Sequence, residues 1–243
     1  VETSHGLLNS VGLENIGVDA VVKDKAPIWA SWRVPVIVNI VGESKSEYVE
    51  IATRLEGVAG VSGIELNISC PNVAAGGLEF GVDPRLAAEV TAGVKAVTSL
   101  PIVVKLSPNV TDVVEIALAV EGAGADALCL INTVKGLAID INKHKNHLRA
   151  ISGGLSGPAI KPIALRMVCD VAKAVHIPVI GCGGISCASD ALEFIVGGAS
   201  AIQVGTATLT NPRAALDILE GIEHLMRERA IENLTELIGV ART

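Results

Sequence analysis

The sequence has few aromatic residues, no long apolar run and no excess of positive charge. Aromatic residues make up 2% of the 243 residues, which leaves little material for stacking on nucleic-acid bases or for an aromatic cage. The formal net charge is -7, and no basic stripe is present, so a nucleic-acid binder is excluded. No run of about 18 apolar residues exists, so we expect no membrane-spanning helix.

Cysteine is also scarce, and the spacing of the cysteines does not match a metal-binding motif. The chain has five cysteines, an odd number, and no Cys-x-x-Cys pair. They are Cys70, Cys129, Cys169, Cys182 and Cys187. This usage predicts reduced thiols in a cytoplasmic protein, with neither a zinc site nor an iron–sulfur cluster in this chain. The first residues, 1–6, resemble neither a signal peptide nor a start at Met.

Half of the residues are hydrophobic and 19% are charged, which suits one large core and a single α/β domain. Short apolar runs alternate with amphipathic segments, and this alternation predicts parallel β/α units. We expect strands at 34–41, 63–69, 101–107, 127–132, 178–183 and 201–206. We expect helices near 47–56, 84–98, 111–121, 161–174, 188–196 and 212–229. No linker or second domain is visible.

Two glycine-containing segments are predicted connections. Residues 9–15 have the Gly and Asn content of a loop, and a surface turn is the simplest interpretation. Residues 122–127 match a dinucleotide-binding pattern by letter, but they precede a strand where that pattern must follow one. The match is therefore a false positive, and the chain shows no NAD site of its own.

Cys70 follows a predicted buried strand in which Ile64, Leu66 and Ile68 alternate with polar residues. Pro71 cannot continue a strand ladder, so the thiol is expected just beyond the strand end. In an α/β barrel, catalytic residues occupy that position. The alternative is that Cys70 is a small core residue, as most free cysteines are.

Three asparagines lie near the ends of predicted strands: Asn39, Asn67 and Asn132. One such amide is usually structural, but three at the same end of successive strands suit a planar ligand with N–H and C=O groups. Lys105 lies in another strand. Its ammonium group either extends out of the strand end or pairs with an anionic ligand, such as a reduced flavin.

Glycines cluster in the last third of the chain. Residues 152–158 are predicted to be a loop with many free amides, and 181–186 and the pair Gly205 and Thr206 end the last two predicted strands. Loops after the last two strands of a barrel commonly bind phosphate through backbone N–H groups. These loops therefore indicate a phosphorylated ligand.

The stretches 9–13, 65–72 and 153–162 together resemble the catalytic subunit of class 1 dihydroorotate dehydrogenase, and the likeness runs over nearly the whole chain. The residues around Cys70, Gly76 and Phe80 look like subclass 1B, whose electron acceptor is NAD. Class 2 enzymes have Ser where this chain has Cys70.

The resemblance implies a TIM (β/α)8 barrel that binds FMN and oxidises dihydroorotate to orotate in pyrimidine biosynthesis. Cys70 would be the base that takes the C5 proton while FMN takes the C6 hydride. The residues expected to hold the substrate are Asn9, Ser10, Val11, Gly12, Leu13, Asn67, Asn132 and Thr133. The residues expected to contact FMN are Asn39, Asn67, Lys105, Ile131, Gly157, Gly183, Gly184, Gly205 and Thr206. No metal site is expected.

The chain departs from the family at its front, because family members carry a further segment before the position of Val1. We count about six strands of the expected eight and treat 1–243 as a single, N-terminally incomplete barrel domain. Alone, it is expected to be poorly soluble and not to retain FMN. The 1B likeness implies a homodimer within a heterotetramer, whose partner subunit carries FAD and a 2Fe-2S cluster and passes electrons to NAD.

Several alternatives remain open. A class 1A enzyme would be a homodimer that reduces fumarate. A phosphate-binding barrel isomerase or aldolase would use Lys105 as a Schiff-base amine, but it leaves Cys70 and the substrate loop without a role. The chain could also be a non-catalytic barrel fragment, or a relative that reduces uracil or thymine in pyrimidine breakdown.

Overall fold

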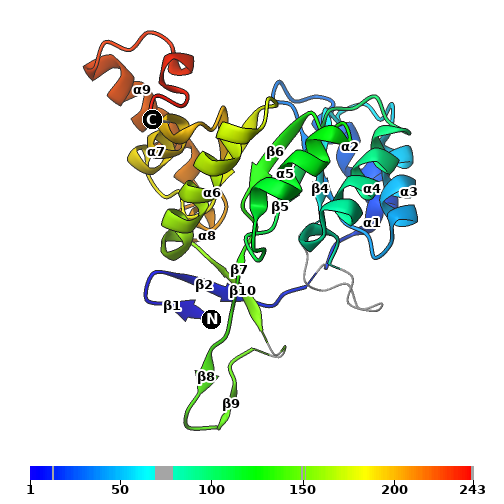
Figure 1. Cartoon of the computed structure of the whole chain (residues 1–243), viewed down its shortest axis with the longest axis horizontal. Helices are drawn as coiled ribbons and strands as arrows, with labels where there is room; N and C mark the ends of the chain where they lie inside the picture. Colours follow the sequence, from blue (N-terminus) through cyan, green and yellow to red (C-terminus); the bar gives the residue numbers. More distant parts are fainter. Residues whose placement is uncertain (13, 69–78, 149, 151, 242–243) are drawn as a thin grey trace. The chain divides into compact units, whose positions relative to one another are not determined.

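The structure, a computed structural model, describes residues 1–12, 14–68, 79–148, 150 and 152–241 (Figure 1). The chain forms two compact units. Unit 1 comprises Val1–Val11, Ser107–Val113 and Cys129–Thr243, and unit 2 comprises Gly12–Leu106 and Val114–Leu128. Within the described ranges, no helix is long and apolar enough to cross a membrane.

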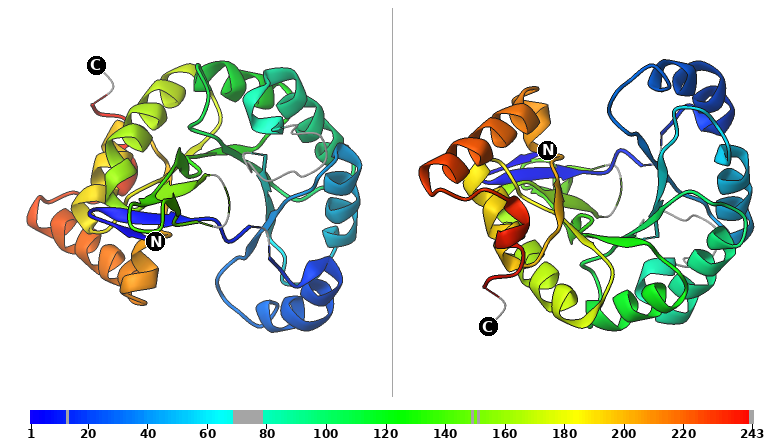
Figure 2. Two further views of the ribbon diagram at one scale, coloured as in Figure 1. Left: turned by 90° about the horizontal axis from the view of Figure 1, so that it is seen from below. Right: turned by 90° about the horizontal axis from the view of Figure 1, so that it is seen from above.

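Unit 2 is built on a parallel sheet of β3 (Ile37–Ile40), β4 (Gly63–Asn67) and β5 (Ile102–Leu106). Each strand is followed by a helix: α3 (Lys45–Leu55), α4 (Pro84–Lys95) and α5 (Val113–Gly122). The helices lie on one side of the strands (Figure 2). Ile64 and Leu66 of β4 are fully buried, so the middle strand supplies the centre of this core.

The polar residues at helix starts explain where the helices of unit 2 begin. Asp83 precedes α4, and its Oδ1 accepts hydrogen bonds from Arg85 N at 2.8 Å and Leu86 N at 3.1 Å. Pro84 occupies the first helical turn, where a missing N–H costs nothing. Before β3, the chain forms α1 (Gly17–Ala20), a π-helical turn (Val21–Lys25) and α2 (Ala26–Trp29).

Unit 1 contains an antiparallel sheet with the strand order β1-β2-β10-β7. The strands are β1 (Glu2–Thr3), β2 (Gly6–Asn9), β10 (Gly153–Ser156) and β7 (Val134–Gly136). A hairpin of β8 (Ile139–Asp140) and β9 (Lys145–Asn146) follows β7 (Figure 1). The start of the chain is thereby held against a segment that lies about 150 residues later, as in the register of Asn9 with Gly154.

The rest of unit 1 continues the β/α pattern. Strand β6 (Ala127–Leu130) passes from unit 2 into unit 1, and β11 pairs in parallel with β12. The elements are α6 (Lys161–Ala174), β11 (Val179–Cys182), α7 (Ala188–Gly197), β12 (Ala201–Gln203), α8 (Ala207–Thr210) and α9 (Ala214–Glu228). Gly198 ends α7 with a φ of 119°, a conformation that favours glycine.

The predicted alternation of strands and helices is confirmed. All six predicted strands are present as β3, β4, β5, β6, β11 and β12, each shorter than expected, and α6 has the predicted bounds. Residues 122–127 lead from the end of α5 into β6, so the dinucleotide-like pattern precedes a strand, as predicted. The short helices before β3 and the hairpin strands were not predicted.

The loop prediction for 152–158 was wrong, because residues 153–156 form β10. The loop prediction for 9–15 holds for its described residues except Asn9, which is the last residue of β2. The physical reason is close approach: a side chain at Gly153 or Gly154 would collide with Asn9 O or with the Thr133 side chain. Glycine therefore serves the pairing of neighbouring strands here.

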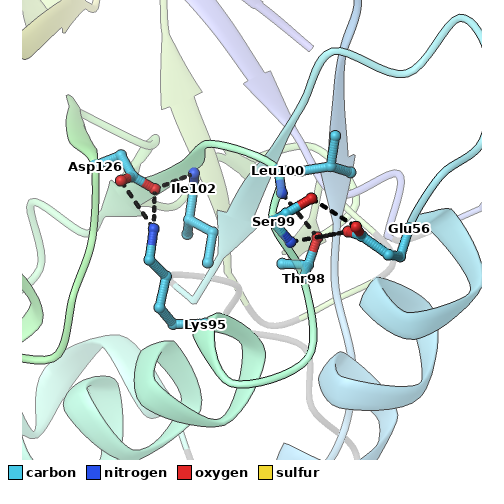
Figure 3. Close-up of polar contacts among 7 residues, drawn as sticks. All are labelled: Glu56, Lys95, Thr98, Ser99, Leu100, Ile102 and Asp126. Atoms are coloured by element: carbon cyan, nitrogen blue, oxygen red, sulfur yellow. Dashed lines mark hydrogen bonds and ion pairs between the residues drawn. The ribbon is translucent and has the colours of Figure 1, made fainter.

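Two polar clusters of unit 2 lie beside the starts of its strands (Figure 3). Glu56 accepts hydrogen bonds from the hydroxyls of Thr98 and Ser99, which lower the pKa of its carboxyl. Asp126 accepts from Lys95 Nζ at 2.7 Å and from Ile102 N at 2.8 Å. Burial raises the pKa of Asp126, but these bonds outweigh it. Both clusters hold the connections that lead into the strands, so we assign them a structural role.

Candidate active site

One face of the unit 2 sheet carries polar side chains. The parallel register pairs Asn39 with Glu65 and Asn67 with Lys105, and Glu65 and Asn67 are two residues apart in β4. Paired residues and residues two apart point to the same side of a sheet. Asn39, Glu65, Asn67 and Lys105, which we call the polar face, therefore lie together, as the sequence predicted for the two asparagines and the lysine.

Glu65 lies at the centre of the polar face. Its Oε1 accepts a hydrogen bond from Asn39 Nδ2 at 2.6 Å and lies 3.5 Å from Lys105 Nζ. The side chain of Glu65 is 6% exposed and that of Lys105 is 17% exposed. Glu65 was not among the residues predicted for the site, although a carboxylate in the middle of an apolar strand is a visible signal in the sequence.

The ends of the segment that contains Cys70 are fixed by described residues. Ile68 O accepts a hydrogen bond from Gly81 N at 2.7 Å, and Asn67 O accepts one from the Tyr48 hydroxyl at 2.8 Å. Cys70 itself and Leu13 lie outside the described residues. Ile68, which follows β4, and Gly81 are nevertheless hydrogen-bonded to each other, so the two flanks of the segment meet next to Asn67.

A cavity of about 300 Å³ lies in unit 2. It is lined by residues of the 12–21 segment, by β3 and by α3, and its walls are mainly aliphatic. Gly12 and Asn39, both predicted site residues, are among its lining residues. The structure thus brings one residue of the predicted substrate loop to β3.

In unit 1, the structure places Asn9, Thr133 and Gly154 together. Asn9 Nδ2 donates to Gly154 O at 3.3 Å, and the Thr133 side chain fills the space where a Cβ on Gly154 would lie. Asn132 Oδ1 accepts a hydrogen bond from Thr133 N at 2.8 Å. Ser10 and Val11 follow β2 outside any strand, and Val11 is exposed.

Asn109 is a polar residue that the sequence analysis missed. Its Nδ2 donates to Thr133 O at 3.1 Å, and its Oδ1 accepts from Lys135 N at 2.9 Å. The amide therefore holds both sides of Val134, at the start of β7. A signal was present, because Ser107-Pro108-Asn109 follows β5 as Cys70-Pro71-Asn72 follows β4.

Three predicted glycines of unit 1 adopt positive φ angles: Gly157 at 88°, Gly183 at 138° and Gly184 at 75°. A Cβ on Gly184 would lie 2.8 Å from Gly157 O and 2.9 Å from Lys161 N. Thr206 Oγ1 donates to Ser156 Oγ at 2.8 Å, beside Gly157. We call Gly157, Gly183, Gly184, Gly205 and Thr206 the glycine cradle.

The cradle combines an open end with close backbone contacts. Nothing lies within 4 Å of a Cβ built on Gly205, so the end of β12 is open. The other glycines let backbone segments approach more closely than any side chain would allow. Ile131, also predicted to contact the cofactor, is buried. Its N–H donates to the carbonyl oxygen of Cys182, the residue before Gly183, at 2.6 Å.

A partly buried ion pair lies next to the cradle. Lys161 Nζ lies 2.7 Å from Asp190 Oδ1 and 3.0 Å from Glu193 Oε1, and Asp190 Oδ2 accepts from Ser186 N at 2.9 Å. Burial raises the pKa of Asp190, but the hydrogen bonds from Lys161 and Ser186 outweigh it and hold that pKa well below its usual range. The hydrogen bonds of Lys161 to Asp190 and Glu193 raise the pKa of Lys161. Because Lys161 contacts Gly184, the pair fixes the cradle.

Asp190→Asn is expected to lower the free energy of unfolding by about 2 kcal/mol at neutral pH, because charged hydrogen bonds are lost in a partly buried site. The folded-state pKa of Asp190 is depressed, so its contribution is present above the unfolded value of 3.8 and is lost as pH falls below it. Urea unfolding at several pH values measures this. Asp170→Asn, on an exposed pair with Arg166, is the control and should change little.

The alternating β/α units define an α/β protein of the barrel class. The family model for Dihydroorotate dehydrogenase matches residues 1–226. The "Dihydroorotate dehydrogenase B (NAD(+)), catalytic subunit" of Trichlorobacter lovleyi is 54% identical over 98% of this chain and 79% of its own length. The protein of the same name from Desulforamulus reducens is 55% identical, over 99% and 79%. The chain belongs to the dihydroorotate dehydrogenase family.

A solved structure supports the same fold. The crystal structure of the Eimeria tenella enzyme, described as DHODH in complex with ferulenol, matches with a TM-score of 0.76 and 21% identity. The match covers 98% of this chain and 72% of that one. The prediction of a TIM barrel with about six strands in this chain is therefore confirmed.

Proposed function

We propose that the chain oxidises dihydroorotate to orotate in pyrimidine biosynthesis, as the catalytic subunit of an NAD-linked enzyme. The observation that carries this proposal is the 54% identity to a B-type catalytic subunit over nearly the whole chain. The fumarate-reducing alternative has no such relative among those named above. The isomerase, the binding fragment and the pyrimidine-breakdown enzyme gain no support from the geometry.

FMN is the proposed cofactor, and the residues present fit it. The glycine cradle would hold the phosphate through backbone N–H groups, and Asn39, Asn67, Lys105 and Ile131 would contact the ring. A phosphate requires open space, which exists at Gly205. An electron-rich ring requires a nearby cation, which Lys105 supplies on the polar face. When bound, FMN supplies the hydride acceptor.

The substrate would be held by Asn9, Ser10, Val11, Gly12, Leu13, Asn67, Asn132 and Thr133. Cys70 would take the C5 proton while the C6 hydrogen leaves as hydride, so the C5–C6 bond becomes double and two electrons leave the substrate. A thiol has a reference pKa of about 8.5, so a modest shift makes it a base near neutral pH. Asn109 would position Thr133 through the backbone bond described above.

The electrons would leave through a partner subunit. The names of the relatives include the words catalytic subunit, which supports a partner. We propose a partner that carries FAD and a 2Fe-2S cluster, a homodimer of this chain within a heterotetramer, and a cytoplasmic location. Both units would belong to one FMN-binding barrel domain.

The test is anaerobic titration with dihydroorotate of the purified protein at the full length of its relatives, because the 243 residues alone are not expected to retain FMN. We expect flavin absorbance in this protein, bleaching by dihydroorotate, and turnover with NAD only when the partner subunit is added. Strong fumarate turnover without the partner subunit would favour the class 1A alternative. A colourless protein that also fails to bind added FMN would contradict the proposed function.

A further inference from the structure

Glu65 has no assigned role in the proposed reaction, yet its surroundings are unusual. Ile64 and Leu66 on either side of it in β4 are fully buried, and the Glu65 side chain is only 6% exposed. Burying a carboxylate is costly unless charged or hydrogen-bonding groups compensate for it. A sequence that needed only stability would place an apolar residue here.

The compensating groups are the two neighbours proposed to contact the flavin. A single oxygen, Oε1, lies 2.6 Å from Asn39 Nδ2 and 3.5 Å from Lys105 Nζ. Asn39 comes from β3 and Lys105 from β5, so Glu65 on the middle strand reaches both. The carboxylate thereby sets the direction of an amide and the position of an ammonium group.

The pairing also changes the field that Lys105 exerts. The Lys105 side chain is 17% exposed, so its charge is only partly screened by water, and a carboxylate at 3.5 Å cancels much of that charge at a distance. A ligand on this face therefore meets a partly neutralised cation. For a cofactor that becomes more electron-rich when reduced, the remaining charge determines how strongly reduction is favoured.

We propose that Glu65 is a positioning residue that orients Asn39 and Lys105 and lowers the reduction potential of the bound flavin by offsetting the charge of Lys105. This inference rests on the proposed function, because it requires FMN at the polar face. It concerns how the site is tuned, and it leaves the identity of the substrate untouched.

Glu65→Gln tests the inference, because it keeps the shape of the side chain and removes its charge. We expect the bound flavin to favour its reduced form about tenfold more than in the parent, a shift of about +30 mV for a two-electron couple. The measurement is anaerobic equilibration of the FMN-loaded protein with a reference dye. Glu89→Gln, the same change at an exposed position of α4, is the matched control and should leave the potential unchanged.

Lys105→Met tests the charge that Glu65 is proposed to offset. This variant is expected to lower the potential, a shift opposite to that of Glu65→Gln, because the two charges have opposite signs at the flavin. A potential unchanged by Lys105→Met would overturn the inference, because Glu65 would then have no charge to offset. Should Glu65→Gln not fold, Glu65→Asp withdraws the carboxylate from Lys105 and is expected to raise the potential by a smaller amount; an unchanged potential would overturn it.

The two proposals fail in different ways. A parent protein that has the full length of its relatives but no affinity for FMN would refute the proposed function itself. A parent protein that binds FMN and is reduced by dihydroorotate, but whose potential is the same in the Glu65→Gln variant, would refute only the tuning role. A lower melting temperature with an unchanged potential would assign Glu65 a purely structural role and would also refute the inference.

Discussion

Cys70→Ser is expected to slow reduction of the bound flavin by dihydroorotate by about 100-fold or more, the range typical for loss of a general base. A hydroxyl is a much weaker base than a thiol with a reference pKa of about 8.5, so the pH optimum should move upward. FMN binding should survive, because Cys70 is not among the proposed cofactor contacts. Anaerobic stopped-flow absorbance across a pH series measures both effects.

Cys187→Ser is the matched control for this experiment. Cys187 is an exposed thiol at the start of α7, where serine is a favourable capping residue, so the same chemical change should leave the flavin chemistry unaltered. If Cys70→Ser reduced the flavin at the parent rate, Cys70 would not be the base. Tyr48 and Phe80, whose rings meet edge to face at 5.8 Å, fix the flanks of this segment in both variants.

The parallel β/α core could be predicted because its signals are local. Apolar runs of strand length alternate with segments of helical period, and α6 begins and ends where its pattern does. The antiparallel sheet could not be predicted in this way. Its strands are short and glycine-rich, and β2 pairs with β10, which lies about 150 residues later, so no local pattern shows the partner.

The same distinction between local signals and long-range contacts applies to the residues of the candidate site. Asn39, Lys105 and the cradle glycines could be named as candidates from the sequence because each residue type carries its chemistry with it, and their roles stay predictions. Glu65 and Asn109 could not, because their roles depend on what lies across the sheet or beside the next loop. The tertiary structure, which places Glu65 between Asn39 and Lys105, supplies the information that the local sequence lacks.

Gly184→Ala is expected to raise the dissociation constant of FMN by roughly 10- to 100-fold. The φ of 75° and the contact of the new Cβ with Gly157 O at 2.8 Å impose a strain of about 1–3 kcal/mol, which the cradle relieves by moving. Gly122→Ala, in α5 with open space around it, is the control and should leave affinity and melting temperature nearly unchanged.

A comparison of FMN with riboflavin locates the effect at the phosphate. Riboflavin lacks the phosphate, so a distorted cradle should weaken FMN binding while riboflavin binding changes little. Gly205→Ala sharpens the comparison, because a Cβ there meets no protein atom. This variant should keep the melting temperature of the parent and still lose FMN affinity, since only the ligand can occupy that space. Equal losses for FMN and riboflavin in both variants, or an unaffected Gly205→Ala protein, would contradict the cradle as the phosphate site.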